Sequence, residues 1–141
     1  MIYADTSFLV SLYTPDSNSA RAAREMKSAA LPILITQLGE VELTNALELR
    51  VFRRELSRTE ANAAYAAFQR DIESGVFFVR SLATAVFERA KQVARGRTAR
   101  LGVRTLDILH VASALVLEAD TFHTFDRNQE RLARAEGLRT F

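Results

Sequence analysis

The sequence contains no cysteine and only two histidines among its 141 residues. The absence of cysteine excludes a disulfide framework and every metal site built from thiolates. With only His110 and His123 as imidazoles, the composition also argues against a histidine-rich transition-metal site. Any metal ion held by this chain must therefore be bound mainly by oxygen atoms, the ligands that Mg²⁺ and Mn²⁺ prefer.

A long apolar run is also missing. The longest apolar stretch, residues 108–117, contains His110 and Ser113 and is too short and too polar for a membrane span. No basic segment followed by an apolar segment precedes the first strand-like residues, so we expect no signal peptide. These absences predict a cytoplasmic protein that makes no membrane contact.

The charge balance is weakly positive, with a formal net charge of +2 and a sequence pI of about 9.4. If several carboxylates share one pocket, the remaining surface is more basic than the net charge implies. Most of the cations are arginines, whose guanidinium groups suit bidentate contacts with phosphate. A weak positive charge alone does not establish a nucleic-acid partner.

The length of 141 residues suits one domain with a real core, which we expect to span residues 1–141. Short β-prone runs alternate with longer helical patterns. Strands are predicted over 2–4, 32–35, 76–79 and 121–125, and helices over 7–12, 18–30, 37–55, 58–74, 84–95, 104–118 and 127–136. Residues 96–102 are predicted to be a basic loop or frayed helix end, and 138–141 an edge strand. The alternation predicts an α/β fold, a three-layer α/β/α sandwich with a mainly parallel sheet of four to five short strands.

Four acidic residues that lie far apart in the sequence are placed within apolar segments or at their ends: Asp5, Glu42, Asp107 and Asp126. Asp5 and Asp126 follow predicted strands, so parallel strands would bring them to the same edge of the sheet, where such folds bind ligands. A carboxylate in apolar surroundings is unfavourable unless it is paired, and converging carboxylates repel one another. A hard divalent cation is the usual remedy, so the four acids are candidate metal ligands.

Each acid also has a simpler explanation when it is taken alone. Asp5 and Asp126 could cap the helices that follow them. Glu42 could be a solvated helix position, and Asp107 could favour the positive end of a helix dipole. Their joint occurrence favours a shared acidic site over four separate explanations.

These acids stand in the segments YADTSFLV, ELTNAL, LDILHVASA and TFDR. In this order and at these separations, the segments resemble the PIN-domain ribonucleases, and most of all the VapC-type toxins of bacterial toxin–antitoxin (VapBC) pairs. The resemblance covers essentially the whole chain. It implies a PIN-like fold with three near-invariant acids, matched by Asp5, Glu42 and Asp107, and a more variable fourth, matched by Asp126. Thr6 matches a hydroxyl residue that supports the pocket.

The resemblance implies an Mg²⁺-dependent endoribonuclease that hydrolyses RNA phosphodiester bonds with one or two ions, Mn²⁺ being an alternative. It also implies a VapB-type antitoxin that inhibits the enzyme, and a homodimer. Two alternatives remain: a PIN-type nuclease of RNA processing without an antitoxin, and a non-catalytic scaffold that binds RNA or protein. The complete set of acids argues against the scaffold. A haloacid-dehalogenase-type phosphatase is rejected because it needs an aspartate where this chain has Ser7.

Several polar residues near these acids are further candidates. Arg97, Arg100 and Arg104 precede Asp107 and are candidates for contacting the RNA backbone, the alternative being a solvated, mobile loop. Asn45, one turn after Glu42, either orients Glu42 or contacts substrate, or else only satisfies a neighbouring backbone group. His110 can share a helix face with Asp107, and a packed or supporting histidine is favoured over a metal ligand.

Overall fold

Four short strands form one parallel sheet in the computed structural model, which describes all residues from 1 to 141. Their order in the sheet is β3-β2-β1-β4, and every neighbouring pair is parallel. The strands are β1 (Ile2–Ala4), β2 (Ile33–Thr36), β3 (Phe77–Arg80) and β4 (Thr121–His123). The predicted edge strand over 138–141 is not formed, because this segment adds only one isolated bridge, between Thr121 and Arg139.

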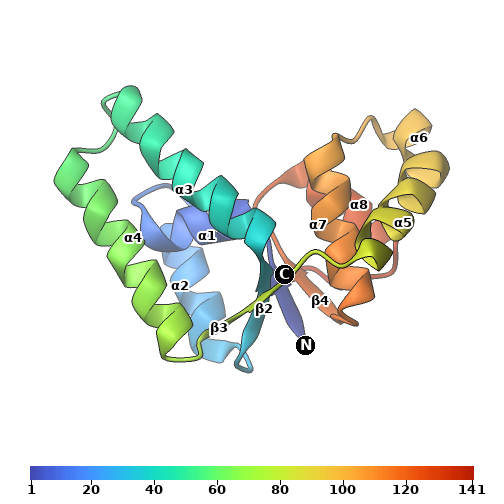
Figure 1. Ribbon diagram of the computed structural model, residues 1–141, viewed down its shortest axis with the longest axis horizontal. Helices are drawn as coiled ribbons and strands as arrows, with labels where there is room; N and C mark the ends of the chain where they lie inside the picture. Colours follow the sequence, from blue (N-terminus) through green and yellow to red (C-terminus); the bar gives the residue numbers. More distant parts are fainter.

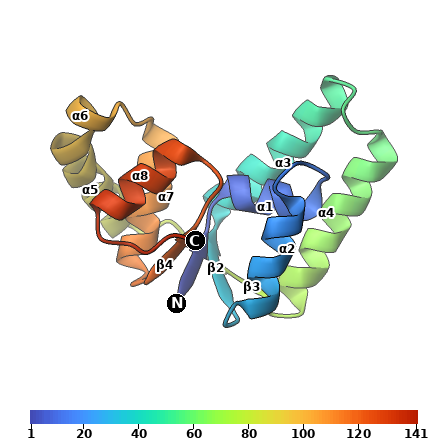
Figure 2. The same ribbon diagram turned by 180° about the vertical axis from the view of Figure 1, so that it is seen from behind.

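Helices cover both faces of the sheet (Figures 1 and 2). One layer contains α1 (Thr6–Tyr13), α2 (Ser19–Ser28), α3 (Gln37–Phe52) and α4 (Arg58–Glu73). The other contains α5 (Thr84–Val93), α7 (Thr105–Val116) and α8 (Arg127–Ala135). Alternate strand residues enter opposite cores, as the two-residue period of a strand requires: Tyr3 packs with the α7 layer, and Ala4 packs with the α1 layer. The predicted three-layer α/β/α fold is confirmed.

Capping side chains mark several helix starts. In the capping box of α4, the Ser57 hydroxyl accepts from the Glu60 amide and the Glu60 carboxylate accepts from the Ser57 amide. Asp5 caps α1 and Asp126 caps α8, each through its side chain. Because β1 and β4 are parallel neighbours, the segments that follow them leave the sheet at the same edge. This edge therefore carries two capping carboxylates.

Residues 96–102 are mostly helical, where a loop or a frayed end is predicted. The chain continues from α5 through a π-helical segment, Ala94–Thr98, into α6 (Ala99–Leu101), and it stops at Gly102, whose φ is +64°. Arg97 holds the segment against α8, because its guanidinium bonds the Glu136 carboxylate and the Ala135 carbonyl, each at 2.7 Å. These partners lie nearly 40 positions away, so a local pattern cannot reveal them.

None of the helices combines the length and apolar character that a membrane crossing requires. The phenylalanines of α4, β3 and α5 divide between core and surface. Phe68 and Phe77 are buried in the core beneath α4, whereas Phe78 and Phe87 are about half exposed.

His123 on β4 is a buried imidazole in an aromatic environment. Its ring centroid lies 5.0 Å from that of Phe8 and 4.7 Å from that of Phe141, and its Nδ1 atom has no hydrogen-bond partner. Burial lowers its pKa from 6.5 to about 4. Between these two pH values His123 binds a proton in the unfolded chain but not in the folded protein. The stability present above pH 6.5 is therefore lost as the pH falls toward 4.

We predict that His123→Leu weakens this acid sensitivity. Between pH 6.5 and 5, the free energy of unfolding of the wild type should fall by roughly 1 kcal/mol per pH unit more than that of the variant. Urea titrations at a series of pH values measure both slopes. Equal slopes would show that His123 is protonated in the folded protein.

Candidate active site

Asp5 is the most deeply buried of the four acids, at the point where β1 ends and α1 begins. Its carboxylate accepts hydrogen bonds from the Ser7 hydroxyl at 2.8 and 3.0 Å, from the Thr124 hydroxyl at 2.6 Å and from the Phe8 amide at 2.9 Å. Burial nevertheless raises its pKa, against the lowering effects of His110 and these hydrogen bonds. An ionised Asp5 is thus incompletely compensated by the protein.

Ser7 and Thr124 connect Asp5 to the segment that carries Asp126. The Ser7 hydroxyl oxygen accepts from the Phe125 amide at 2.8 Å, and the Thr124 hydroxyl oxygen accepts from the Asp126 amide at 2.9 Å. Each hydroxyl therefore donates to Asp5 and accepts from the loop after β4. Sequence analysis did not select these two residues, although each is a hydroxyl residue two positions from a strand-end acid.

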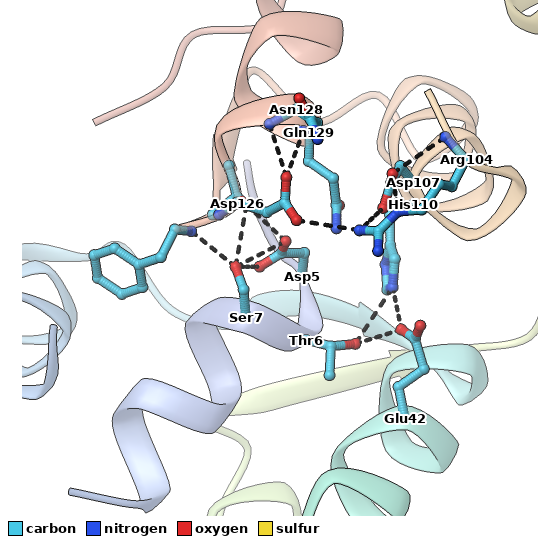
Figure 3. A network of polar contacts seen from close by, with 12 residues as sticks. Asp5, Thr6, Ser7, Glu42, Arg104, Asp107, His110, Asp126, Asn128 and Gln129 are labelled. Atoms are coloured by element: carbon cyan, nitrogen blue, oxygen red, sulfur yellow. Dashed lines mark hydrogen bonds and ion pairs between the residues drawn. The ribbon is translucent and has the colours of Figure 1, made fainter. Parts of the chain in front are cut away.

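Glu42 lies on α3, and one of its carboxylate oxygens accepts two hydrogen bonds. Its Oε2 accepts from the Thr6 hydroxyl and from His110 Nε2, both at 2.5 Å (Figure 3). Burial alone would raise its pKa, but the hydrogen bond and charge of His110, with the Thr6 hydrogen bond, hold it below its usual value. Glu42 is therefore favoured in its ionised form, and its Oε1 makes no hydrogen bond.

His110 extends from α7 to Glu42, and its other ring nitrogen is held by a second hydrogen bond. Its Nδ1 lies 2.8 Å from the Tyr3 hydroxyl, which in turn lies 3.2 Å from the Thr36 hydroxyl. Both His110 and Tyr3 are fully buried. The imidazole is thus a packed side chain that positions a carboxylate, in agreement with the favoured interpretation of the sequence.

Asp107 and Asp126 share one cation, Arg104. The guanidinium donates to both oxygens of Asp107, from Nε at 3.0 Å and from Nη2 at 3.2 Å, and the same Nη2 lies 3.2 Å from Asp126 Oδ2. Asp107 is buried in the first turn of α7, and Asp126 uses its other oxygen to cap α8. Figure 3 shows the guanidinium between the two carboxylates.

The four acids come from the end of β1, from α3, from α7 and from the start of α8, and they surround one region at the carboxyl edge of the sheet (Figure 3). No three acidic or histidine side chains converge closely enough here to share one ion, because each has a protein partner instead. The acid oxygens nevertheless suit a hard divalent cation, and two acids already share a protein cation. By donor chemistry these residues therefore suit a divalent cation, while their protein partners hold the acids apart.

The other candidate residues lie apart from this region. Asn45 is exposed on α3 and makes no side-chain hydrogen bond to Glu42. Arg97 is engaged with Glu136 and α8. Arg100 is exposed and forms no ion pair. Of the three arginines proposed to contact RNA, the fold brings only Arg104 to the acids.

Comparison with known proteins places this geometry in context. A family model described as the PIN domain matches residues 2–135 of the chain. No curated protein sequence matches it significantly.

Several solved structures share the fold over nearly their whole length. VapC20 of Mycobacterium tuberculosis, described as a sarcin-ricin loop cleaving toxin, is 22% identical, with a TM-score of 0.74 over 98% of this chain and 96% of that one. FitAcB of Neisseria gonorrhoeae is 19% identical, with a TM-score of 0.71 over 100% and 96%. VapBC2 of Rickettsia felis, bound to a promoter DNA fragment, is 18% identical, with a TM-score of 0.64 over 100% and 98%. At such identities the likeness establishes the fold alone.

The contact between His110 and Glu42 gives a testable prediction. Replacing His110 with leucine removes the hydrogen bond and the charge that lower the Glu42 pKa, so burial should dominate and the pKa should rise. Carboxyl ¹³C NMR titration measures it, with Glu42→Gln identifying the resonance. Glu60, whose pKa is lowered by its hydrogen bonds with Ser57, is the internal control and should not change. An unchanged Glu42 pKa would contradict the assigned role of His110.

Proposed function

This chain belongs to the PIN domain family, and we propose from this premise that it is an Mg²⁺-dependent endoribonuclease that acts as the toxin of a toxin–antitoxin pair. PIN domains are typically nucleases, so the family supports phosphodiester hydrolysis. The observation that carries the proposal is the gathering of Asp5, Glu42, Asp107 and Asp126 at one sheet edge, with no member of the acid set replaced.

Hydrolysis of a phosphodiester needs an activated water and relief of the negative charge on the phosphate, and a bound Mg²⁺ supplies both. The four carboxylates would hold the ion. Glu42 is suited to orient the attacking water, because Oε2 is fixed by Thr6 and His110 while Oε1 remains free to accept a proton. Ser7 and Thr124 hold the Asp5 carboxylate in place through direct hydrogen bonds.

RNA is the proposed substrate, in single-stranded segments or loops. Arg104 supports this, since it presents an exposed guanidinium beside the acids, where phosphate must lie during cleavage. VapC20, which shares the fold, is described as cleaving the sarcin-ricin loop.

An antitoxin and a second copy of the chain are the proposed protein partners. Structures with the same fold include the FitAB and VapBC toxin–antitoxin assemblies, some of them bound to DNA. The surface of this chain offers apolar side chains for such contacts: Phe52 on α3 is 83% exposed, and Phe87 on α5 and Leu106 on α7 are each 47% exposed.

Replacing Asp5 with asparagine should abolish cleavage without unfolding the protein. Asparagine removes a metal-binding charge, and we expect activity on RNA with Mg²⁺ to fall by at least about 100-fold. Since burial raises the Asp5 pKa, the ionised carboxylate destabilises the fold at neutral pH, and the variant should be at least as stable as the wild type.

Cleavage of labelled RNA and thermal unfolding test both expectations. Asp71→Asn is the matched control, because Asp71 lies on α4 and bonds Tyr13 outside the site. It should keep full activity. Mg²⁺-dependent cleavage retained by Asp5→Asn would overturn the proposed site.

Co-expression with a neighbouring small gene tests the toxin assignment. Growth arrest by this chain alone, relieved by the neighbour and absent with Asp5→Asn, is the expected result. RNA cleavage in vitro without growth arrest would instead favour a nuclease of RNA processing. Arrest that persists with Asp5→Asn would show that toxicity does not come from this site.

A further inference from the structure

Asp107 depends on a single residue for its charge compensation. It is buried, and all the hydrogen bonds to its side chain come from Arg104: from the backbone amide at 3.3 Å, from Nε at 3.0 Å and from Nη2 at 3.2 Å. The acids Asp5 and Glu42 are instead held by hydroxyls, an amide and an imidazole. Because an unpaired buried carboxylate is strongly unfavourable, Arg104 is what makes an ionised Asp107 tolerable in the metal-free protein.

One nitrogen of Arg104 also lies between two carboxylate oxygens of the site. Nη2 lies 3.2 Å from an oxygen of Asp107 and 3.2 Å from an oxygen of Asp126. A divalent cation that joined the same two oxygens would need the space held by this nitrogen. The guanidinium and an ion bound to these two oxygens would therefore exclude each other, by volume and by charge.

The side chain of Arg104 is also placed so that it can move away from the carboxylates into solvent. Its side chain is 70% exposed, whereas the side chain of Arg97 is 30% exposed and is fixed by Glu136 and the carbonyl of Ala135. The contact with Asp126 is partly solvated, and exposed ion pairs contribute little stability. Rotation of the arginine side chain into solvent would open the pair of carboxylates without moving the backbone.

We propose that Arg104 is the internal counter-cation of this site and that a divalent ion binds only by displacing it. Arg104 thereby sets the metal affinity of the free protein. At low metal concentration its guanidinium pairs with Asp107 and Asp126, and at high metal concentration the ion takes its place on these carboxylates. The inference rests on the proposed metal-dependent function, but it concerns binding of the ion and can be measured without any RNA.

The test is isothermal titration of Mn²⁺ into the metal-stripped full-length chain, comparing wild type, Arg104→Gln and Arg100→Gln. Arg100→Gln removes the same charge from an exposed arginine that forms no ion pair, so it controls for general electrostatics. Arg104→Gln should bind Mn²⁺ about three- to tenfold more tightly than the wild type. Arg100→Gln should stay within about twofold of the wild type, because exposed charges are screened by salt.

Thermal unfolding gives a second readout that guards against a folding defect. Without metal, Arg104→Gln should have a lower Tm than Arg100→Gln, because Asp107 loses its partner. Added Mn²⁺ should raise the Tm of Arg104→Gln by more than it raises that of the wild type. Arg104→Lys keeps the charge but not the forked geometry, and its Mn²⁺ affinity should lie between those of wild type and Arg104→Gln.

The outcomes separate the inference from the proposed function. If the wild type binds Mn²⁺ and Arg104→Gln binds it no more tightly than Arg100→Gln, the counter-cation role is overturned while the metal site stands. If neither the wild type nor Arg104→Gln binds Mn²⁺, the metal site fails and the inference fails with it. Asp107→Asn should lose binding in either background, and unchanged binding would also overturn the proposal.

Discussion

The rest of the site depends on the burial of the Asp5 carboxylate at the end of β1. A charge in that position is tolerated only if neighbouring groups compensate it, and the neighbours come from two directions. Ser7 and the Phe8 amide belong to the start of α1, while Thr124 belongs to the loop after β4. Because the same two hydroxyls accept from Phe125 and Asp126, compensating Asp5 also fixes where the chain leaves β4.

The four acids are stabilised by three kinds of partner. Asp5 receives neutral hydrogen bonds, Glu42 receives an imidazole and a hydroxyl, and Asp107 and Asp126 share a guanidinium. None of these partners is another acid, so the protein itself keeps the carboxylates apart. These local pairings offset the mutual repulsion that would otherwise oppose folding.

Much of the fold followed from local patterns, whereas the site followed only in part. The strands, the capping box at Ser57 and the capping aspartates depend on neighbours a few positions apart, so the sequence displays them. The helical path through residues 94–101 depends on Arg97 meeting Glu136, and no local pattern contains that contact. Likewise Arg104 appeared to belong with Arg97 and Arg100 on one basic segment, yet only Arg104 turns toward Asp126, 22 positions away.

Capping a helix does not use the whole carboxylate of Asp126. Oδ1 caps α8, while Oδ2 is directed at the cation of Arg104, so one carboxylate makes both contacts with different atoms. A cap also fixes the rotation of the carboxyl group through its hydrogen bonds to the helix amides. The helices that follow β1 and β4 therefore orient these two acids, Asp5 and Asp126. A helix start is thus more than a competing explanation for a strand-end aspartate, because it also holds a carboxylate oxygen in position.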